Sequence, residues 1–402
     1  GNNPALTLVV GSNNQAATYA SGDNSTTLVF QYTIQAGDND TNGISIGENT
    51  LALNGGTISD PAGNNAILDH SAVSANNSYM VDTTAPTVDN FTITDTKLLV
   101  GETMTVNLGF SEKVIEFIAA DINLDNATGA LPSMASSDNR TWSGTFTPTA
   151  DSEDASNTLS LTTSSYTDPA GNAGPSAITS NYEVETWAPS VSSIVISASG
   201  IQNNFLNAGD NVSVTSTFSE NVLVTNTPQL TLVVGGDNRT ATYTSGDNST
   251  TLVFQYTIQA GETDSNGISI GANAIALPSG STIRDAAGNN ATLTHNAVSD
   301  NASYKVDTTA PTANFTKAND NVGTVTGDFS SDNTTDDTAL VLSGTNETGS
   351  SVKVYDNSTE LGTATAESTT SWSYSATVTN GTTHLFNVRE TDLAGNTSAA
   401  TS

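Results

Sequence analysis

The sequence predicts an all-β protein made of several small β-sandwich domains in tandem. Three observations lead there: short runs of β-branched and aromatic residues, turns rich in Gly, Asn and Asp between them, and a long internal repeat. Of the 402 residues, 35% are hydrophobic, which is enough for packed cores. No long stretch shows the periodicity of an amphipathic helix.

Strand patterns occur along the whole chain. Residues 103–110 (TMTVNLGF), 251–258 (TLVFQYTI) and 351–355 (SVKVY) are rich in residues that favour strands and are bounded by Gly, Asn and Asp. Each run is long enough for one strand of a sandwich, and polar turns separate the runs.

The repeat joins two distant parts of the chain. Residues 4–11 (PALTLVVG) return as residues 228–235 (PQLTLVVG), and residues 21–37 (SGDNSTTLVFQYTIQAG) return unchanged as residues 245–261. Near-identity of this length indicates duplication within an array of repeated domains.

Three joints share one pattern, at residues 81–86 (VDTTAP), 184–189 (VETWAP) and 306–311 (VDTTAP). Each ends in proline, which favours an extended entry into the next domain. The predicted domains are residues 1–86, 87–189, 190–311 and 312–402. Their sizes and strand patterns fit immunoglobulin-like β-sandwiches, so the fold class that we expect is a linear array of tandem Ig-like domains.

The first domain is expected to lack its N-terminal strands. The third domain opens with residues 190–227, which have no counterpart before Pro4. Two explanations remain open: the chain is a piece of a longer array, or another molecule supplies those strands, as in a strand-donating filament. Because strand donation is the rarer arrangement, the first explanation is preferred.

The charge excludes some partners. The chain has 41 Asp and Glu against 9 Lys and Arg, a formal net charge of −32, and no Cys. We therefore expect no binding to nucleic acid, which needs clustered cations, no disulfides or thiolate metal sites, and, without a long apolar run, no membrane insertion.

Carboxylates recur at the ends of the domains. The motif Asp-x-Ala-Gly-Asn is a tight turn, and it begins at Asp60, Asp168, Asp285 and Asp392. If strand directions alternate regularly, three groups form at the three joints. They are Asp60, Asp82 and Glu112; Asp168, Glu185 and Glu220; and Asp285, Asp307, Asp320 and Glu347.

A fourth group, Asp332, Asp336 and Asp337, is expected at the same end of the last domain as Asp392. Several carboxylates in one small volume repel each other unless a cation lies between them. Oxygen ligands suit Ca²⁺, whereas zinc or copper would need the Cys or His ligands that this chain scarcely has. The sequence thus predicts Ca²⁺ sites at the joints. The alternative is that these acids are only solvated turn residues.

These motifs resemble the bacterial Ig-like repeats of large surface adhesins, including biofilm-associated and RTX-type adhesins. The joint pattern, the Asp-x-Ala-Gly-Asn turn and the strand ends at Glu112 and Glu220 carry the resemblance, and the last domain is similar to a second repeat type. This resemblance implies extender domains on the bacterial cell surface. They would be stiffened by Ca²⁺ and packed against neighbouring Ig-like domains or against other copies in a fibre. Glu185 and Trp187 depart from the joint pattern, as do Asn319 and Asn321 around Asp320.

No catalytic residues are expected. His70 and His295 occupy equivalent repeat positions, which favours a structural role, His384 stands alone, and no nucleophile, nucleotide or zinc-protease motif occurs. A glycan-binding module is a rival interpretation, with Trp142, Trp187 and Trp372 as a sugar-stacking platform. Lone tryptophans are more often core or joint anchors.

Overall fold

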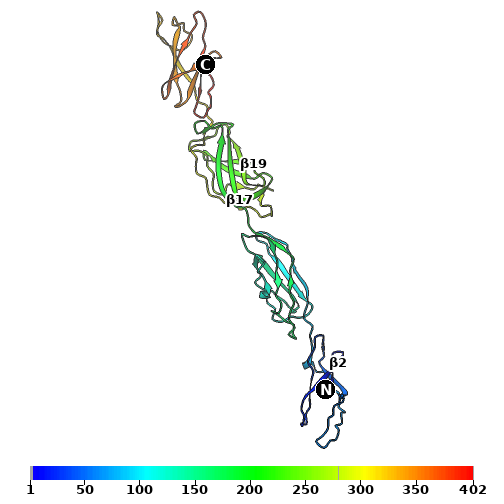
Figure 1. The fold of residues 1–402 in the computed structure, drawn as a ribbon. Helices are drawn as coiled ribbons and strands as arrows, with labels where there is room; N and C mark the ends of the chain where they lie inside the picture. Colours follow the sequence, from blue (N-terminus) through cyan, green and yellow to red (C-terminus); the bar gives the residue numbers. More distant parts are fainter. Residues whose placement is uncertain (1–2, 279, 402) are drawn as a thin grey trace. The chain divides into compact units, whose positions relative to one another are not determined.

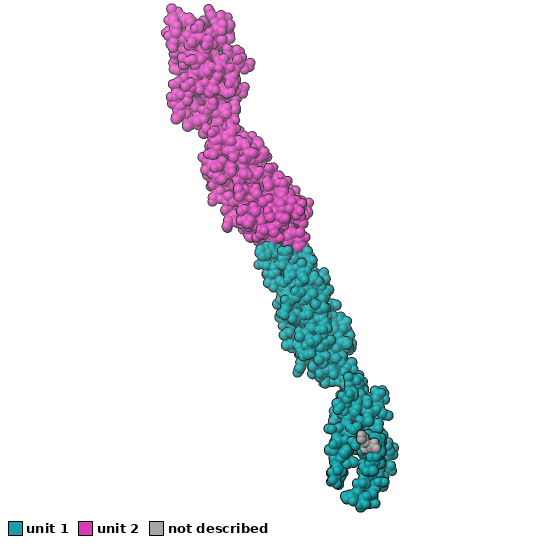
Figure 2. Space-filling model, in the orientation of Figure 1, with its two compact units in different colours: residues 1–187 teal, residues 188–402 magenta. Residues whose placement is uncertain are grey.

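The computed structural model describes residues 3–278 and 280–401. It divides into two compact units, Gly1–Trp187 and Ala188–Ser402 (Figures 1 and 2). Strands make up nearly all of the regular structure, and the two described helical turns, Asn77–Tyr79 (η1) and Ala119–Asp121 (η2), have three residues each. No helix in the described ranges has the length and apolar character of a membrane span. The predicted class, tandem Ig-like β-sandwiches, is confirmed.

The first domain contributes a single antiparallel sheet in the order β3-β2-β1-β4. Its strands are β1 (Ala5–Val10), β2 (Asn13–Ser21), β3 (Val29–Gln31) and β4 (Ser45–Ala52). Val10 and Ala17 are buried, but much of the remaining apolar surface of this domain is not.

The second domain is a sandwich around its own core. One sheet has the order β5-β7-β10-β9, and the facing strands form the sheets β11-β14-β6 and β13-β12-β8. The bounds are β5 (Val88–Ile93), β6 (Lys97–Leu98), β7 (Met104–Phe110), β8 (Ile122–Asn123), β9 (Gly129–Ala130), β10 (Thr141–Pro148), β11 (Glu153–Asn157), β12 (Ser160–Leu161), β13 (Ala177–Ile178) and β14 (Tyr182–Glu185). Alternate residues of β7 point into the core, as its sequence pattern predicts.

The third domain repeats the sheet of the first and adds strands to it. Its main sheet has the order β15-β17-β20-β19-β18-β22, with β23 beside β17, and a second sheet has the order β16-β24-β21. The bounds are β15 (Val191–Ser199), β16 (Phe205–Leu206), β17 (Asn211–Thr225), β18 (Gln229–Val234), β19 (Asp237–Ser245), β20 (Ser249–Thr257), β21 (Thr263–Asp264), β22 (Ile275–Ala276), β23 (Thr282–Arg284) and β24 (Lys305–Asp307).

The fourth domain is a sandwich of the sheets β26-β25-β27-β31-β30 and β29-β28-β32. The bounds are β25 (Asn314–Asp320), β26 (Gly327–Phe329), β27 (Ala339–Thr345), β28 (Ser351–Asp356), β29 (Thr359–Thr363), β30 (Thr365–Ser368), β31 (Ser371–Thr377) and β32 (Phe386–Thr391). Separate hydrophobic clusters fill the second, third and fourth domains.

Candidate metal centre

Three carboxylates meet where the first domain joins the second. One oxygen from each of Asp82, Glu112 and Asp168 lies within 4.8 Å of the others, and no other group of three or more such ligands is found among the described residues. Asp168 is buried, Glu112 is partly buried and Asp82 is exposed. Burial raises the pKa of Glu112, and the charges of Asp82 and Asp168 raise it further. Glu112 therefore holds its proton more tightly than an ordinary glutamate does.

Backbone hydrogen bonds place each of these carboxylates. Asp82 follows Val81, whose N–H and carbonyl pair with Asp40 at 2.9 and 2.6 Å. Glu112 comes two residues after β7 ends at Phe110. Asp168 is the first residue of its turn. It lies near Glu112 because the preceding residue, Thr167, pairs with Ile115, three residues after Glu112.

An asparagine of the same turn ties the two domains together. Asn172 Nδ2 donates to Asp168 Oδ2 at 2.7 Å and to the carbonyl oxygen of Asp82 at 3.1 Å. Asp168 Oδ1 in turn accepts the N–H groups of Ala170 and Asn172 at 2.8 and 2.9 Å. The turn of the second domain is thus hydrogen-bonded to the last residues of the first domain.

The joint between the third and fourth domains is built in the same way. Asn396 Nδ2 donates to Asp392 Oδ2 at 2.9 Å and to the carbonyl oxygen of Asp307 at 2.8 Å. Burial raises the pKa of Glu347, followed by the charges of Asp392, Asp307 and Glu390. These four carboxylates are therefore electrostatically coupled.

Glu390 adds a buried charge to that joint. Its side chain has no exposed surface, and one oxygen accepts the Glu347 N–H and the Ser350 hydroxyl, both at 2.5 Å. Its Oε2 is buried and finds no hydrogen-bond donor in the described part of the chain. A buried carboxylate oxygen without a partner is costly unless a cation compensates it.

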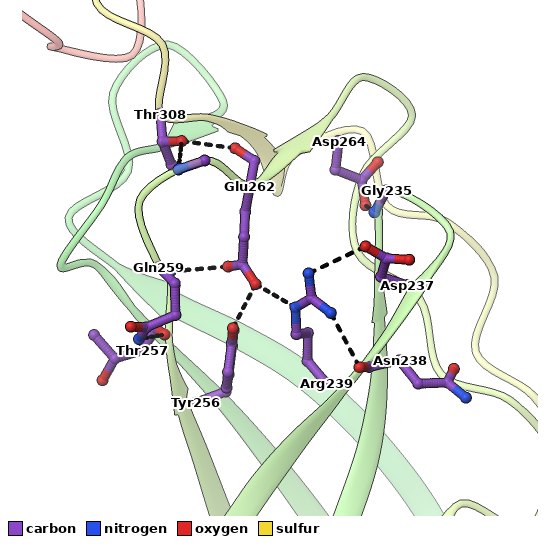
Figure 3. A network of polar contacts seen from close by, with 11 residues as sticks. Gly235, Asp237, Asn238, Arg239, Tyr256, Thr257, Gln259, Glu262, Asp264 and Thr308 are labelled. Carbon is purple, nitrogen blue, oxygen red and sulfur yellow. Dashed lines mark hydrogen bonds and ion pairs between the residues drawn. The ribbon is translucent and has the colours of Figure 1, made fainter.

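A polar network positions the joint aspartate of the third domain (Figure 3). Glu262 accepts hydrogen bonds from Tyr256 at 2.5 Å, from the Gln259 N–H at 2.8 Å and from Arg239. Thr308, the residue after Asp307, donates to the Glu262 carbonyl at 2.9 Å and accepts the Gly261 N–H at 2.8 Å. The segment that carries Asp307 is thereby fixed to its own domain.

The first domain has the same network with paired substitutions. Asp38 replaces Glu262 and accepts from Tyr32 at 2.7 Å and from Gln15, which replaces Arg239, at 3.0 Å. Thr83 donates to the Asp38 carbonyl at 3.0 Å. Both joint aspartates are therefore held by a threonine anchored to a buried acid.

The expected grouping at the first joint is wrong in one member. Asp82 and Glu112 meet, but Asp168 takes the place that was assigned to Asp60. The Asp60 carboxylate accepts hydrogen bonds within its own turn, from the N–H groups of Ala62 and Asn64 and from the Asn64 side chain. The Asp168 turn lies at the entrance of the second domain, because the preceding residue, Thr167, pairs with Ile115, three residues after Glu112.

The expected grouping at the third joint is also wrong in one of its turn residues, Asp285. Asp285 follows β23, which pairs with the far half of β17 through Leu223 and Arg284, so it lies at the Glu220 end of its domain and not with Asp307. Asp392 replaces it at the joint, since Ser351 pairs with Thr391 beside Glu347.

Asp320 is also misplaced by the sequence pattern. It accepts a hydrogen bond from Thr335 at 2.6 Å and therefore lies beside the loop that carries Asp336 and Asp337. That loop was expected to lie with Asp392, which the structure assigns to the joint instead. Asp332 belongs to the same loop, and Asp336 is engaged by Thr324.

The expected grouping of Asp168 with Glu185 and Glu220 is likewise wrong for Asp168. Glu185 ends β14 opposite Glu153, and Glu220 lies within β17. Their role as metal ligands stays a prediction.

Two kinds of site residue were missed. Asn172 and Asn396 close the turn motif and could have been chosen from it, because an Asn amide that satisfies one carboxylate oxygen has a second donor left. No sequence motif singles out Glu390. The equivalent position in the second domain, two residues before the turn, is occupied by Tyr166.

The histidines and tryptophans have structural surroundings. His70 accepts the Thr50 N–H at 2.9 Å and the equivalent His295 accepts the Ala274 N–H at 2.7 Å. Trp142 packs against Phe117 with ring centroids 4.9 Å apart, and Trp372 is 2% exposed in another core. His384 contacts Asp356 at 2.6 Å, and Trp187 is about half exposed. Glycan binding stays a prediction.

Several solved structures are similar to this chain at low identity. Titin domains I67–I69, in an E-to-A variant, show 10% identity with a TM-score of 0.31, over 78% of this chain and 95% of that one. The Escherichia coli adhesin FdeC shows 12% identity with a TM-score of 0.28, over 76% and 91%. The ICAM-5 D1–D4 fragment shows 10% identity with a TM-score of 0.25, over 79% and 75%. Scores this low carry no information about function.

Family comparisons are more specific. No curated protein matches the chain significantly. Residues 82–184 match one family described as bacterial Ig-like domain, and residues 307–402 match a second family with the same description. Both matches begin at a joint aspartate, Asp82 or Asp307, and include the carboxylates that meet it. The chain is thus a tandem of Ig-like sandwiches in which these two segments match bacterial Ig-like domains.

Proposed function

We propose that this chain is a structural extender segment of a secreted bacterial surface protein, in which Ca²⁺ fixes the joints between neighbouring Ig-like domains. The observation that carries the proposal is the convergence of Asp82, Glu112 and Asp168 from two domains. Tandem sandwiches, the duplicated sequence and the matches to bacterial Ig-like domains support the extender role. The same family matches support a position outside the cell, on a bacterial surface.

The donor atoms suit a hard divalent cation. All three side chains offer carboxylate oxygens, and Ca²⁺ takes six to eight oxygen ligands with tolerant geometry. No Lys or Arg forms a salt bridge with any of the three in the described part of the chain. Asp82, Glu112 and Asp168 would hold the ion, and water would complete its coordination.

The mechanical effect follows from the charges. Two carboxylates about 5 Å apart repel by ~1 kcal/mol in water-like screening and by ~3 kcal/mol near a protein surface. Without a cation the repulsion acts between Asp82 of one domain and the two acids of the next. A bound Ca²⁺ would replace it with attraction and stiffen the joint.

The joint of the third and fourth domains is the second candidate site. Asp307, Glu347 and Asp392 occupy the same motif positions, the charges of Asp392 and Asp307 act on Glu347, and the Oε2 of Glu390 is buried without a hydrogen-bond partner among the described residues. This joint would bind Ca²⁺ through the same three motif positions, with Glu390 strengthening the local potential.

Calorimetric titration of the whole chain with Ca²⁺ tests the proposal. Affinities in the ~10⁻⁴ to 10⁻³ M range of extracellular modules are expected. Small-angle scattering with and without a chelator should then show a smaller average dimension without Ca²⁺. No heat of binding together with unchanged scattering would show that Ca²⁺ does not stiffen the chain.

A further inference from the structure

In both copies of the repeat, the segment that flanks the first strand of the repeat carries a bulge. Leu230 of β18 pairs with Ile275. Further along the strand, Val233 bridges to Ser269. From 230 to 233 β18 advances by three residues, whereas from 275 back to 269 the flanking segment advances by six. The ladder between β1 and β4 is irregular at the equivalent place, so the bulge is built twice.

A histidine supplies a hydrogen-bond acceptor inside each bulge. A bulge leaves a backbone N–H outside the ladder. The Ala274 N–H donates to His295 Nε2 at 2.7 Å, and the N–H of the equivalent residue, Thr50, donates to His70 Nε2 at 2.9 Å. Because an amide without an acceptor costs free energy where water is excluded, the histidine stabilises the bulged conformation.

An asparagine ties the bulge to the same histidine by two more bonds. Asn273 has a φ of 56°, in the left-handed region. Its Oδ1 accepts the His295 N–H at 3.0 Å, and its own N–H donates to the His295 carbonyl at 3.2 Å. Asn49, with a φ of 54°, makes the same two bonds with His70, at 2.8 and 3.2 Å. Three hydrogen bonds thus join each histidine to its bulge.

The partners of the ring define where its proton lies. Nε2 faces a backbone N–H and must accept. Nδ1 faces a carbonyl oxygen, that of Asn296 at 2.7 Å for His295 and that of Ser71 at 3.0 Å for His70, so it must donate. Both conditions select the neutral ring with its proton on Nδ1. A second proton, on Nε2, would point at the backbone N–H, and the bond to the bulge would be lost.

The groove beside the His295 ring contains no other charged or titratable side chain. This groove of about 680 Å³ is lined by residues 191–194, 272–273 and 294–298, and the ring is only partly buried. Asp69 and Glu48 lie beside the first bulge in sequence, but both are exposed, and neither pairs with His70 in the described part of the chain. A proton on either ring therefore lacks a carboxylate partner.

The third histidine of the chain has different surroundings. His384 Nδ1 lies 2.6 Å from a carboxylate oxygen of Asp356, and an opposite charge favours the protonated ring. Its Nε2 contacts the Thr382 hydroxyl at 2.9 Å as well as the Thr379 N–H at 3.0 Å. A hydroxyl can accept as well as donate, so a protonated His384 would keep two partners.

We propose that His295 is an acid-sensitive latch that holds residues 269–276 on β18, and that His70 is the same latch for β4 on β1. Protonation of Nε2 breaks the bond to the bulge and frees the flanking segment. Histidine changes its charge between about pH 5 and 8. Since the open segment takes up the proton and the closed one does not, the latch is closed at neutral pH and weakens as the pH falls. No candidate metal ligand takes part, so the latch stands independently of Ca²⁺.

Nuclear magnetic resonance of the ring nitrogens in the whole chain tests the protonation state. With ¹⁵N only in histidine, the three rings of the chain give separate long-range ¹H–¹⁵N correlations, assigned by His295→Gln and His70→Gln. At about pH 7.5, where free histidine is neutral, both rings should carry their proton on Nδ1. A ring with its proton on Nε2, or a charged ring at this pH, overturns the proposal.

Amide hydrogen exchange tests the latch itself. Rates are corrected for their intrinsic pH dependence and followed in proteolytic fragments of residues 269–276 and 45–52, which differ in sequence and therefore in mass. Protection of both segments should fall by about tenfold between about pH 7.5 and 5.5, the effect of one lost hydrogen bond. β20 should stay protected.

Two variants separate the proton from the hydrogen bond. His295→Gln places an amide oxygen near the position of Nε2 but cannot take up a proton, so the protection of residues 269–276 should no longer depend on pH. His295→Phe has no acceptor, and protection should be low at both pH values. His384→Gln is the matched control and should leave residues 269–276 unchanged.

The native chain decides the outcome even if a variant does not fold. Equal corrected protection of residues 269–276 at the two pH values overturns the proposal. A fall of the same size in β20 also overturns it, because the loss of protection would then be global and the latch would not be local.

Discussion

Asn396 Nδ2 donates a hydrogen bond of 2.8 Å to the carbonyl oxygen of Asp307, across the joint between the third and fourth domains. Asn172 makes the equivalent bond of 3.1 Å to Asp82. Both asparagines also hold the first aspartate of their own turn. At these two joints one residue type therefore links the turn of a domain to the end of the previous one.

Replacing this amide should loosen the joint and leave the domain folded. Asn396→Ala removes the bond to Asp307, a loss of about 1 kcal/mol, and should speed amide exchange in residues 305–311 severalfold. Asn64→Ala is the matched control, since the Asn64 amide bonds Asp60 in the same turn and carries no described bond to another domain. If Asn64→Ala speeds amide exchange at the joint nearest to it as much as Asn396→Ala does in residues 305–311, Asn396 has no linking role.

Glu112→Gln should weaken Ca²⁺ binding at the first joint about tenfold or more, a loss of ~1.4 kcal/mol or greater. Glu48→Gln, which removes an exposed carboxylate on β4, should have no effect. Calorimetry with both variants makes the comparison. If the two bind Ca²⁺ alike, Glu112 is no ligand.

Without Ca²⁺ the same variant should have the opposite effect on stability. Burial, Asp82 and Asp168 raise the pKa of Glu112 in the folded chain. Its contribution to stability is therefore present at low pH and is lost as the pH rises through the folded value. At pH 7 in chelator, Glu112→Gln should make the second domain more resistant to urea, and the gain should vanish near pH 4.

The network around Glu262 should make the third domain sensitive to acid. Burial alone would raise the pKa of Glu262, but hydrogen bonds from Tyr256, Gln259 and Arg239 outweigh it, and the pKa is lowered from its ordinary value of 4.5. Stability from this group is present above about pH 4.5 and is lost as the pH falls through the folded value. Exchange protection of residues 256–264, corrected for intrinsic rates, should fall in acid in the native chain. In Glu262→Gln it should be low throughout.

Tyr256 reports the same network from the alkaline side. Burial and the bond to Glu262 raise its pKa to about 12, so its contribution is lost as the pH rises through that value. An ultraviolet titration should show one fewer tyrosine ionising late in Tyr256→Phe. Loss of the tyrosine from the early phase near pH 10, with the late phase unchanged, would mean that Tyr256 is not bonded to Glu262.

One substitution made in both copies of the repeat should have different costs. Phe254 is fully buried and Phe30 is partly exposed. Phe254→Ala should destabilise its domain by ~3–5 kcal/mol, whereas Phe30→Ala should cost much less. Urea denaturation monitored by proteolysis at each domain would measure both, and equal costs would mean that the first domain is closed in solution.

The sequence alone determined the class of fold, the repeat, the joints and the residue types that gather there. Alternation along segments such as residues 103–110 needs only local periodicity, and the turn motif needs only Gly and Asn at fixed positions. Asp82 and Glu112 were correctly placed together for that reason, because each directly follows a strand that runs to the joint.

Only the tertiary structure decided which other carboxylate meets them. Asp168 and Asp392 lie at the entrance of their own domains because distant segments pair there, Ile115 with Thr167 and Ser351 with Thr391, and local pattern does not specify strand direction. The identical residues 21–37 and 245–261 show the same limit. Their sequence encodes a strand, but the strand extends to nine residues only where β17 supplies hydrogen-bond partners.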